Sequence, residues 1–204
     1  MHPLLGVVIA YLAGSIPSAH IAGRLRGIDL RKEGSGNLGA TNVSRVLGWE
    51  TGVVVLLADM LKGALPVALL PQAVVTGRPD IWAVAFGVAA ILGHVRPIFL
   101  LGRGGGKGVA TAAGVFLALA WLPFFISQIV FFSVAFMTRY ISLASLSAAV
   151  MLPIAILLWT GNTASPVFIA SVLIVLFVFW NHRANIGRLR RGEESKFSFK
   201  RKTA

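Results

Sequence analysis

Long apolar runs separated by short polar segments dominate the chain. A helix that crosses the hydrocarbon core of a bilayer needs about 20 mostly apolar residues, and several such runs follow one another here. They predict membrane helices over 4–25, 52–75, 81–100, 109–138, 141–160 and 166–181. The run 109–138 is longer than one span requires and contains Trp121-Leu122-Pro123 in its middle. Because proline disrupts helix interiors, we expect two shorter helices there, with one long kinked helix as the alternative.

This pattern predicts an all-α membrane protein with seven transmembrane helices in a single domain over residues 1–204. The chain becomes apolar almost at once after Met1, without a basic region before the first run. We therefore expect the first helix to be retained rather than removed as a signal peptide.

The basic residues set the expected orientation. The chain has 19 Lys and Arg against 7 Asp and Glu. With the C-terminus in the cytoplasm, all of the basic residues except Lys62 and Arg78 fall in cytoplasmic segments, including the basic tail over 183–204. The positive-inside rule thus predicts an outer N-terminus and a cytoplasmic C-terminus, in an inner membrane. If 109–138 were one helix, everything upstream would be reversed.

Composition narrows the classes of function. A basic chain can bind nucleic acid, but basic residues that flank membrane helices and face anionic lipids explain this charge better, so no nucleic-acid partner is expected. The sequence has no cysteine. Disulfides, thiolate nucleophiles and zinc–cysteine sites are therefore excluded.

The polar stretch 26–50 predicts an ordered loop or short re-entrant helices. Within it, residues 34–45, called here the first glycine segment, combine glycines whose N–H groups can converge on an anion with neutral donors and one guanidinium. The candidate phosphate-binding residues are Gly34, Ser35, Gly36, Asn37, Gly39, Ala40, Thr41, Asn42 and Arg45. The alternative is a plain surface loop that uses Gly and Asn for turns.

Residues 102–111, the second glycine segment, open a helix and place a lysine among glycines. Backbone N–H groups, the helix dipole and Lys107 together predict an anion site. A Walker A loop is excluded, because Leu101 stands where that motif needs glycine and Gly108 where it needs Ser or Thr. The alternative is a flexible loop with a positive-inside lysine. The further candidates here are Gly105, Gly106, Gly108 and Thr111.

Two later segments on the same predicted face carry weaker signals. Ser142 and Ser145 begin a helix, where serine commonly bonds to helix backbone. His182 and Asn185 are three residues apart and would share a helix face, with His182 able to accept a proton near neutral pH. The alternative is an ordinary interfacial helix end.

Charged and titratable groups within the spans favour structural roles. Asp59 and Lys62 are three apart on one helix and predict an ion pair, since charges in a bilayer are costly and usually paired. His20 and His94 are expected to be hydrogen-bonded structural groups. No cluster of carboxylates suggests a metal site, which argues against a magnesium-dependent lipid phosphotransferase. No metal or cofactor is expected.

Together these segments resemble the PlsY family of bacterial acyl-phosphate:glycerol-3-phosphate acyltransferases. The resemblance covers nearly the whole chain. It rests on Gly34–Arg45, on Gly93-His94 with Pro97, on Gly105–Thr111, on Ser142–Ser145 and on His182–Leu189. Two positions depart from the family pattern, Arg96 where an aromatic residue is common, and Gly104.

The resemblance implies a location in the plasma (inner) membrane of a bacterium, a reaction and a set of residues. An acyl phosphate, rather than an acyl thioester, would acylate the sn-1 hydroxyl of glycerol 3-phosphate in the first step of phospholipid synthesis. The products would be lysophosphatidic acid and inorganic phosphate. The active-site residues it implies are Ser35, Arg45, Lys107, His182 and Asn185, with the backbone of 39–41 in the acyl-phosphate pocket and Glu194 in a structural role. A weak association with the enzyme that produces acyl phosphate is a further expectation.

An acyl phosphate has a good leaving group, so we expect direct attack by the glycerol hydroxyl without an acyl-Ser35 intermediate. Arg45 and Lys107 would hold the glycerol phosphate, and the glycine amides would stabilise charge on the donor. The general base is either His182 or a phosphate oxygen of the donor. The competing class is a transporter of a phosphorylated solute, which lacks support because no internal repeat is visible. A membrane scaffold would not explain the glycine clusters.

Overall fold

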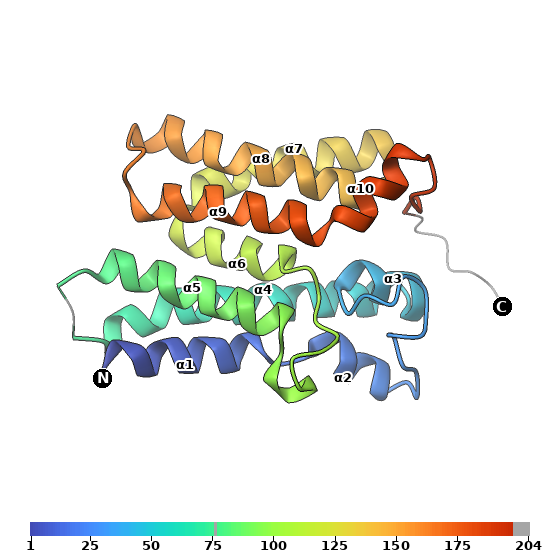
Figure 1. Ribbon diagram of the computed structural model, residues 1–204, viewed down its shortest axis with the longest axis horizontal. Helices are drawn as coiled ribbons and strands as arrows, with labels where there is room; N and C mark the ends of the chain where they lie inside the picture. Colours follow the sequence, from blue (N-terminus) through green and yellow to red (C-terminus); the bar gives the residue numbers. More distant parts are fainter. Residues whose placement is uncertain (76, 198–204) are drawn as a thin grey trace. The chain divides into compact units, whose positions relative to one another are not determined.

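The computed structural model describes residues 1–75 and 77–197, and the regular secondary structure in these ranges is helical throughout. The chain divides into an N-terminal unit that ends at Leu119 and a C-terminal unit that begins at Ala120. The N-terminal unit runs from blue to yellow-green in Figure 1 and contains both glycine segments.

The N-terminal unit contains α1 (Pro3–Gly14), α2 (Ser18–Arg24), α3 (Ala40–Leu47), α4 (Trp49–Ala73), α5 (Pro79–Val95), the 3₁₀ turn η1 (Ile98–Leu100) and α6 (Val109–Leu119). The C-terminal unit contains α7 (Trp121–Thr138), α8 (Ile141–Thr160), α9 (Pro166–Asn181) and α10 (Arg183–Arg190).

The described part of the chain has 5 helical segments that are long and apolar enough to cross a membrane, or 6 if the bent pair α9 and α10 forms one span. They are Pro3–Arg24, α4, Pro79–Leu100 (α5 with η1), α7 and α8, and the axes of α9 and α10 meet at 60°. The helix α6 is apolar but only 11 residues long. An all-helical membrane protein is thus confirmed, whereas the seventh span and the orientation stay predictions.

Two of the apolar runs that predict helices contain a helix break in the structure. The run 109–138 is two helices, α6 and α7, as expected, and the break falls at Ala120 (φ −154°, ψ 67°). Pro123 lies within the first turn of α7, where proline is tolerated. The predicted membrane helix over 4–25 corresponds to one candidate span, Pro3–Arg24, but this span is interrupted, since α1 ends at Gly14 and α2 begins at Ser18. Pro17 explains this break, because it disfavours helical backbone at Ile16 and cannot donate a helix hydrogen bond.

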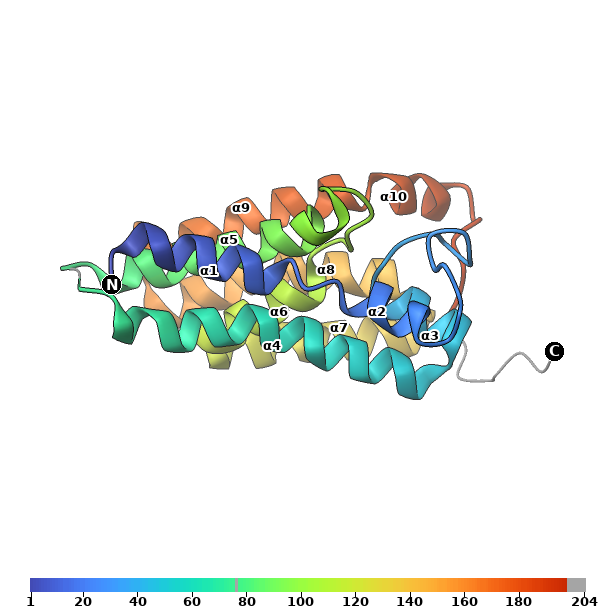
Figure 2. The ribbon, with the colours of Figure 1, turned by 90° about the horizontal axis from the view of Figure 1, so that it is seen from below.

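Small residues bring the helices of the N-terminal unit close together. Gly14 of α1 abuts the backbone carbonyl of Ala90 in α5, and Gly114 of α6 abuts the carbonyl of Met60 in α4. Figure 2 shows α1, α4 and α5 running alongside one another. This is the packing expected between membrane helices, where small residues allow backbones to approach.

In each unit the polar segments expected on the cytoplasmic face gather at one end. In the N-terminal unit, the amino group of Met1 donates to Ala73 O (2.6 Å) at one end. The two glycine segments lie at the other end (Figure 1). In the C-terminal unit, the N–H of Phe197 donates to Arg139 O (2.8 Å). The tail after α10 therefore returns to the junction between α7 and α8.

Candidate functional site

A small hydrophobic core anchors the first glycine segment. Leu30, Leu38 and Val43 are buried together with Ala19 of α2 and Val55 of α4. These contacts fix the chain on both sides of residues 34–37, called here the tip of the segment, and α3 packs against α4. Gly34 and Ser35 of the tip are exposed. The local fold therefore follows from apolar residues that alternate with the glycine-rich, polar positions.

The buried side chain of Asn42 holds the backbone around the tip of this segment in place through hydrogen bonds. Its side chain is 1% exposed. Its Oδ1 accepts from the backbone N–H of Ser35 (2.8 Å), while its Nδ2 donates to the carbonyls of Leu30 (3.3 Å) and Glu33 (3.1 Å). We expected Asn42 among the phosphate-binding residues; in the structure its amide binds the backbone of the loop and positions Ser35.

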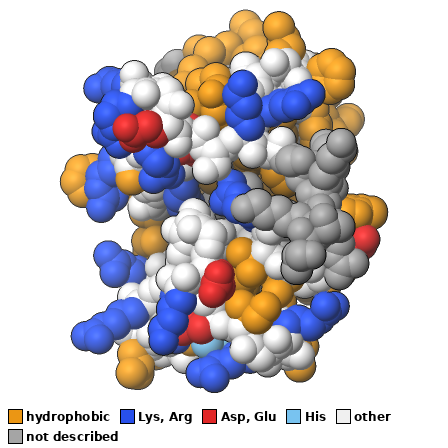
Figure 3. Space-filling view, turned by 90° about the vertical axis from the view of Figure 1, so that its right-hand side faces the viewer, with side chains coloured by type: hydrophobic (Ala, Val, Ile, Leu, Met, Phe, Trp, Pro, Cys, Tyr) orange, Lys and Arg blue, Asp and Glu red, His pale blue; other side chains and the backbone are white. Residues whose placement is uncertain are grey.

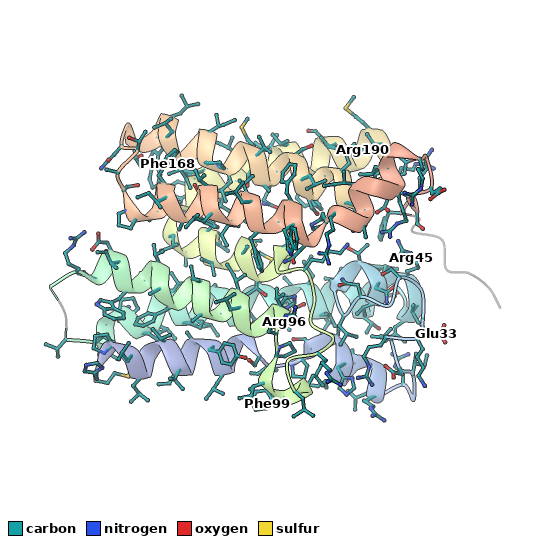
Figure 4. The ribbon with its side chains drawn as sticks, in the orientation of Figure 1. Glu33, Arg45, Arg96, Phe99, Phe168 and Arg190 are labelled. Atoms are coloured by element: carbon teal, nitrogen blue, oxygen red, sulfur yellow. The ribbon has the colours of Figure 1, made fainter. Side chains whose placement is uncertain are left out.

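The N-terminus of α3 and its exposed residues form the polar surface of the segment. Gly39 is the N-cap residue, with extended backbone (φ −118°, ψ 159°) and no side-chain cap. The first N–H groups of such a helix lack partners within the helix and attract anions. Ser35 and Arg45 are exposed, and Figure 4 shows Arg45 on α3. The arrangement offers backbone amides, a hydroxyl and a guanidinium to an anion.

The second glycine segment is seated on the end of α5. A Cβ at Gly105 would collide with the carbonyls of His94 and Val95, and a Cβ at Gly106 would collide with Nε2 of His94. Gly108 has a left-handed backbone (φ 86°), which strongly favours glycine, and α6 begins immediately after it. Lys107 is half-buried. Because the loop backbone lies so close to α5, the position from which the Lys107 side chain extends is fixed.

The structure brings the two glycine segments together within the N-terminal unit. A Cβ at Gly106 would lie 3.1 Å from Leu38 O, and one at Gly104 would lie 3.2 Å from Cδ of Arg31. Arg96, one departure from the family pattern, donates to Gly102 O (3.4 Å). Backbone amides from both segments and the charges of Arg45 and Lys107 thus lie at one end of the same unit.

Two candidate side chains of the predicted set are buried within the helices. Thr111 is fully buried at the point where α6 packs against Gly63 of α4, and its Oγ1 makes no hydrogen bond among the described residues. Ser145 Oγ donates to Ile141 O (2.8 Å) in its own helix, which is the common use of serine in a helix.

His182 stands at the bend between α9 and α10 and is 3% exposed. Its Nδ1 lies 2.8 Å from Val178 O. A carbonyl oxygen only accepts hydrogen bonds, so Nδ1 carries the hydrogen in the neutral ring. Its Nε2 is then the nitrogen able to accept a proton.

Glu194 orients Asn185, the other residue of this pair. The Nδ2 of Asn185 donates to Oε1 of Glu194 (2.6 Å), and Nε of Arg188 donates to Oε2 (2.7 Å). Burial raises the pKa of Glu194, but the contacts with Asn185, Ser142 and Arg188 outweigh it and lower that pKa on balance. Ser142 contributes by proximity, since its buried Oγ lies outside hydrogen-bond geometry among the described residues. These contacts agree with the structural role expected of Glu194.

The electrostatic character of the site suits anions. Figure 3 faces the end that carries α3, where Lys and Arg side chains are prominent. Within residues 1–75 and 77–197, no three His, Asp or Glu side chains group as a metal ion would require. The expected Asp59–Lys62 ion pair is confirmed, with Lys62 Nζ 2.8 Å from Asp59 Oδ1.

Comparisons of the sequence and of the fold with known proteins find similar chains. A family model described as glycerol-3-phosphate acyltransferase matches residues 4–192. A glycerol-3-phosphate acyltransferase of Geobacter sulfurreducens is 43% identical over 97% of this chain and 98% of its own length. One of Bacillus cytotoxicus is 45% identical over 96% of both chains.

Two solved structures are similar to this chain. One is the crystal structure of PlsY, an integral membrane glycerol 3-phosphate acyltransferase, in its glycerol 3-phosphate form, with TM-score 0.88, 38% identity and 96% of both chains covered. The other, its lysophosphatidic acid form, has TM-score 0.86 and 36% identity, and covers 97% of this chain and 96% of the other.

Proposed function

The chain belongs to the glycerol-3-phosphate acyltransferase family, and from this premise we propose that it transfers a fatty acyl group from an acyl phosphate to the sn-1 hydroxyl of glycerol 3-phosphate. The products are lysophosphatidic acid and inorganic phosphate. The relatives' structures with glycerol 3-phosphate and with lysophosphatidic acid support this reading, and nothing in the comparisons supports a transporter.

The observation that carries the proposal is the meeting of two glycine segments at one end of the N-terminal unit. Both substrates carry phosphate, and each segment offers backbone N–H groups beside a basic side chain, Arg45 in the first and Lys107 in the second. In the proposal, Arg45 and Lys107 hold the phosphate of glycerol 3-phosphate. The amides at the start of α3 face the phosphate of the donor and stabilise the charge that develops on it.

The chemistry is a direct acyl transfer. The sn-1 oxygen attacks the acyl carbon, a new ester bond forms, and the bond between the acyl carbon and the phosphate oxygen breaks. The electron pair of that bond leaves with inorganic phosphate. The hydroxyl proton passes either to Nε2 of His182 or to a phosphate oxygen of the donor. The hydrogen bond from Nδ1 of His182 to Val178 O supports the first route, because it leaves Nε2 as the acceptor.

The membrane arrangement completes the proposal. We propose seven spans, counting α6 and the bent pair α9 and α10, with an outer N-terminus and the glycine segments facing the cytoplasm of a bacterium. Large apolar side chains on the outer surface of α1, α4 and α7 are exposed, as lipid contact requires. The acyl chain of the donor then reaches the site from the bilayer.

This topology is testable because the chain has no cysteine of its own. Single variants Ser35→Cys, Lys107→Cys and Arg78→Cys, in intact cells, are treated with a thiol reagent that cannot cross the membrane. Position 78 should react from outside, whereas positions 35 and 107 should react only after the cells are opened. If positions 35 and 107 fall on opposite sides of the membrane, the shared phosphate site is refuted.

The activity itself is tested with purified protein in detergent, supplied with glycerol 3-phosphate and an acyl phosphate. Equal amounts of inorganic phosphate and lysophosphatidic acid should appear, and omission of glycerol 3-phosphate should stop both. Lys107→Ala should raise the KM for glycerol 3-phosphate more than that for acyl phosphate, while Arg78→Ala, an exposed basic residue at the opposite end, should change neither. An equal loss for both substrates would reject the role of Lys107.

A further inference from the structure

A buried polar network lies directly beneath the second glycine segment. Asp59, Lys62 and His94 are 1%, 8% and 5% exposed. Lys62 Nζ lies 2.8 Å from Asp59 Oδ1 and also donates to Ile16 O (2.8 Å), and His94 Nδ1 lies 3.6 Å from the same Asp59 oxygen. Charged groups within a span are costly, so a network of three polar side chains at this place indicates a role other than packing.

The histidine is the member of this network that touches the glycine segment. One edge of the imidazole faces Asp59 through Nδ1. The opposite edge faces Gly106 so closely that a Cβ there would collide with Nε2. The ring therefore lies between the carboxylate and the loop backbone, and the residue after Gly106 is Lys107.

A plain ion pair does not explain this placement. Lys62 already balances the charge of Asp59 and finds a second acceptor in Ile16 O. The ring of His94 is not needed for neutrality, yet it occupies the space on which Gly106 rests. Gly105 meets the carbonyls of His94 and Val95 on the same side. The loop is thus supported from below by residue 94, through both its backbone and its ring.

We propose that His94 is a positioning residue for the second glycine segment. Its imidazole, which faces Asp59 at 3.6 Å without a hydrogen bond among the described residues, occupies the space beneath Gly106. It thereby sets the position of the loop backbone and the place where Lys107 presents its charge to the phosphate of glycerol 3-phosphate. This inference rests on the proposed function. His94 acts from behind the loop and does not touch the substrate.

The first test separates positioning from general stability. In His94→Ala the loop loses its support, so the KM for glycerol 3-phosphate should rise by about 10- to 100-fold, the scale of a misplacement near 1 Å. The KM for acyl phosphate should stay within about twofold. The matched control is Phe86→Leu, which leaves a cavity near the middle of the same helix, about two turns from His94. It should lower the Tm and leave both KM values unchanged.

The second test asks whether ring and glycine act as a pair. Gly106→Ala alone should raise the same KM, because its methyl group collides with the ring. In the double variant His94→Ala/Gly106→Ala the methyl group enters the space that the ring has left. The KM of the double variant for glycerol 3-phosphate should therefore be lower than the value obtained by multiplying the two single increases in KM. His94→Gln, which keeps an amide facing Asp59, should restore most of the affinity.

Each outcome of these tests either supports or overturns the positioning role of His94. If the two KM values of His94→Ala keep the wild-type ratio, or if the double variant shows independent effects, the inference is overturned. If His94→Ala does not fold, His94→Gln and Gly106→Ala carry the same comparison. A wild-type protein that forms no lysophosphatidic acid refutes the proposed function instead, which no property of the variants would do.

Discussion

The tip of the first glycine segment depends on one buried amide, and replacing it gives a quantitative prediction. Asn42→Ala removes three hydrogen bonds, to the Ser35 N–H and to the carbonyls of Leu30 and Glu33. At a net 0.5–1.5 kcal/mol each, the ordered loop should lose about 1.5–4.5 kcal/mol. One factor of ten corresponds to about 1.4 kcal/mol, so the ordered population should fall relative to the open one by about 10- to 2,000-fold.

The effect should be local, because the helices on either side of the loop keep their own packing. We expect a large fall in kcat/KM, faster hydrogen exchange over residues 30–39, and a small change in Tm. Asn42→Asp tests the polarity of the site at nearly constant size. It keeps the acceptor for Ser35 but turns a carboxylate oxygen toward two carbonyls, so it should be as impaired as the alanine variant.

Asn162→Ala is the matched control, since that side chain accepts one exposed hydrogen bond in the 161–165 turn (2.9 Å, from Ala164 N). Its effect should stay within about 0.5 kcal/mol. If Asn42→Ala keeps kcat/KM within about twofold of wild type and shows unchanged hydrogen exchange, the proposed support of the loop is refuted.

Three further predictions follow from the contacts described above. His182→Ala should lower kcat by about 10²–10⁴ if Nε2 accepts the proton, and a near-normal kcat would assign that role to the donor phosphate. Glu194→Gln should lower the Tm at neutral pH. Because the pKa of Glu194 in the folded protein lies below the ordinary 4.5, the difference in Tm from wild type should vanish as the pH falls through that folded pKa. A difference in Tm that stays constant with pH would contradict this. Gly114→Val should separate α6 from the carbonyl of Met60 and lower the Tm sharply, whereas Gly77→Ala, with open space around it, should not.

Much of the fold was predictable because apolar run length reports directly on membrane helices. The runs over 52–75, 141–160 and 166–181 match α4, α8 and α9 closely. The break after Gly14 was missed although Pro17 was a visible signal, since apolar residues continue through it. The proposed seventh span has weaker support, because α6 is apolar but only 11 residues long.

At the candidate site, the type of a residue does not by itself determine its role. An asparagine in a glycine-rich loop can donate to a ligand or to the loop itself, and only the fold shows that Asn42 does the second. The ion pair of Asp59 and Lys62 was predictable from their spacing and their place in a span. The contact of His94 with Gly106 joins residues from different elements, so no local pattern indicates it.

The two glycine segments share a mode of support that explains why polar groups are buried beneath them. Backbone amides bind phosphate well only if they are held in place before the ligand arrives. Glycine gives such a loop little rigidity of its own, because it has the largest conformational freedom. Under the first segment the amide of Asn42 supplies that rigidity, and under the second the ring of His94 supplies it. Each buried polar group is costly in a membrane protein, and each lies next to the backbone whose position the reaction requires.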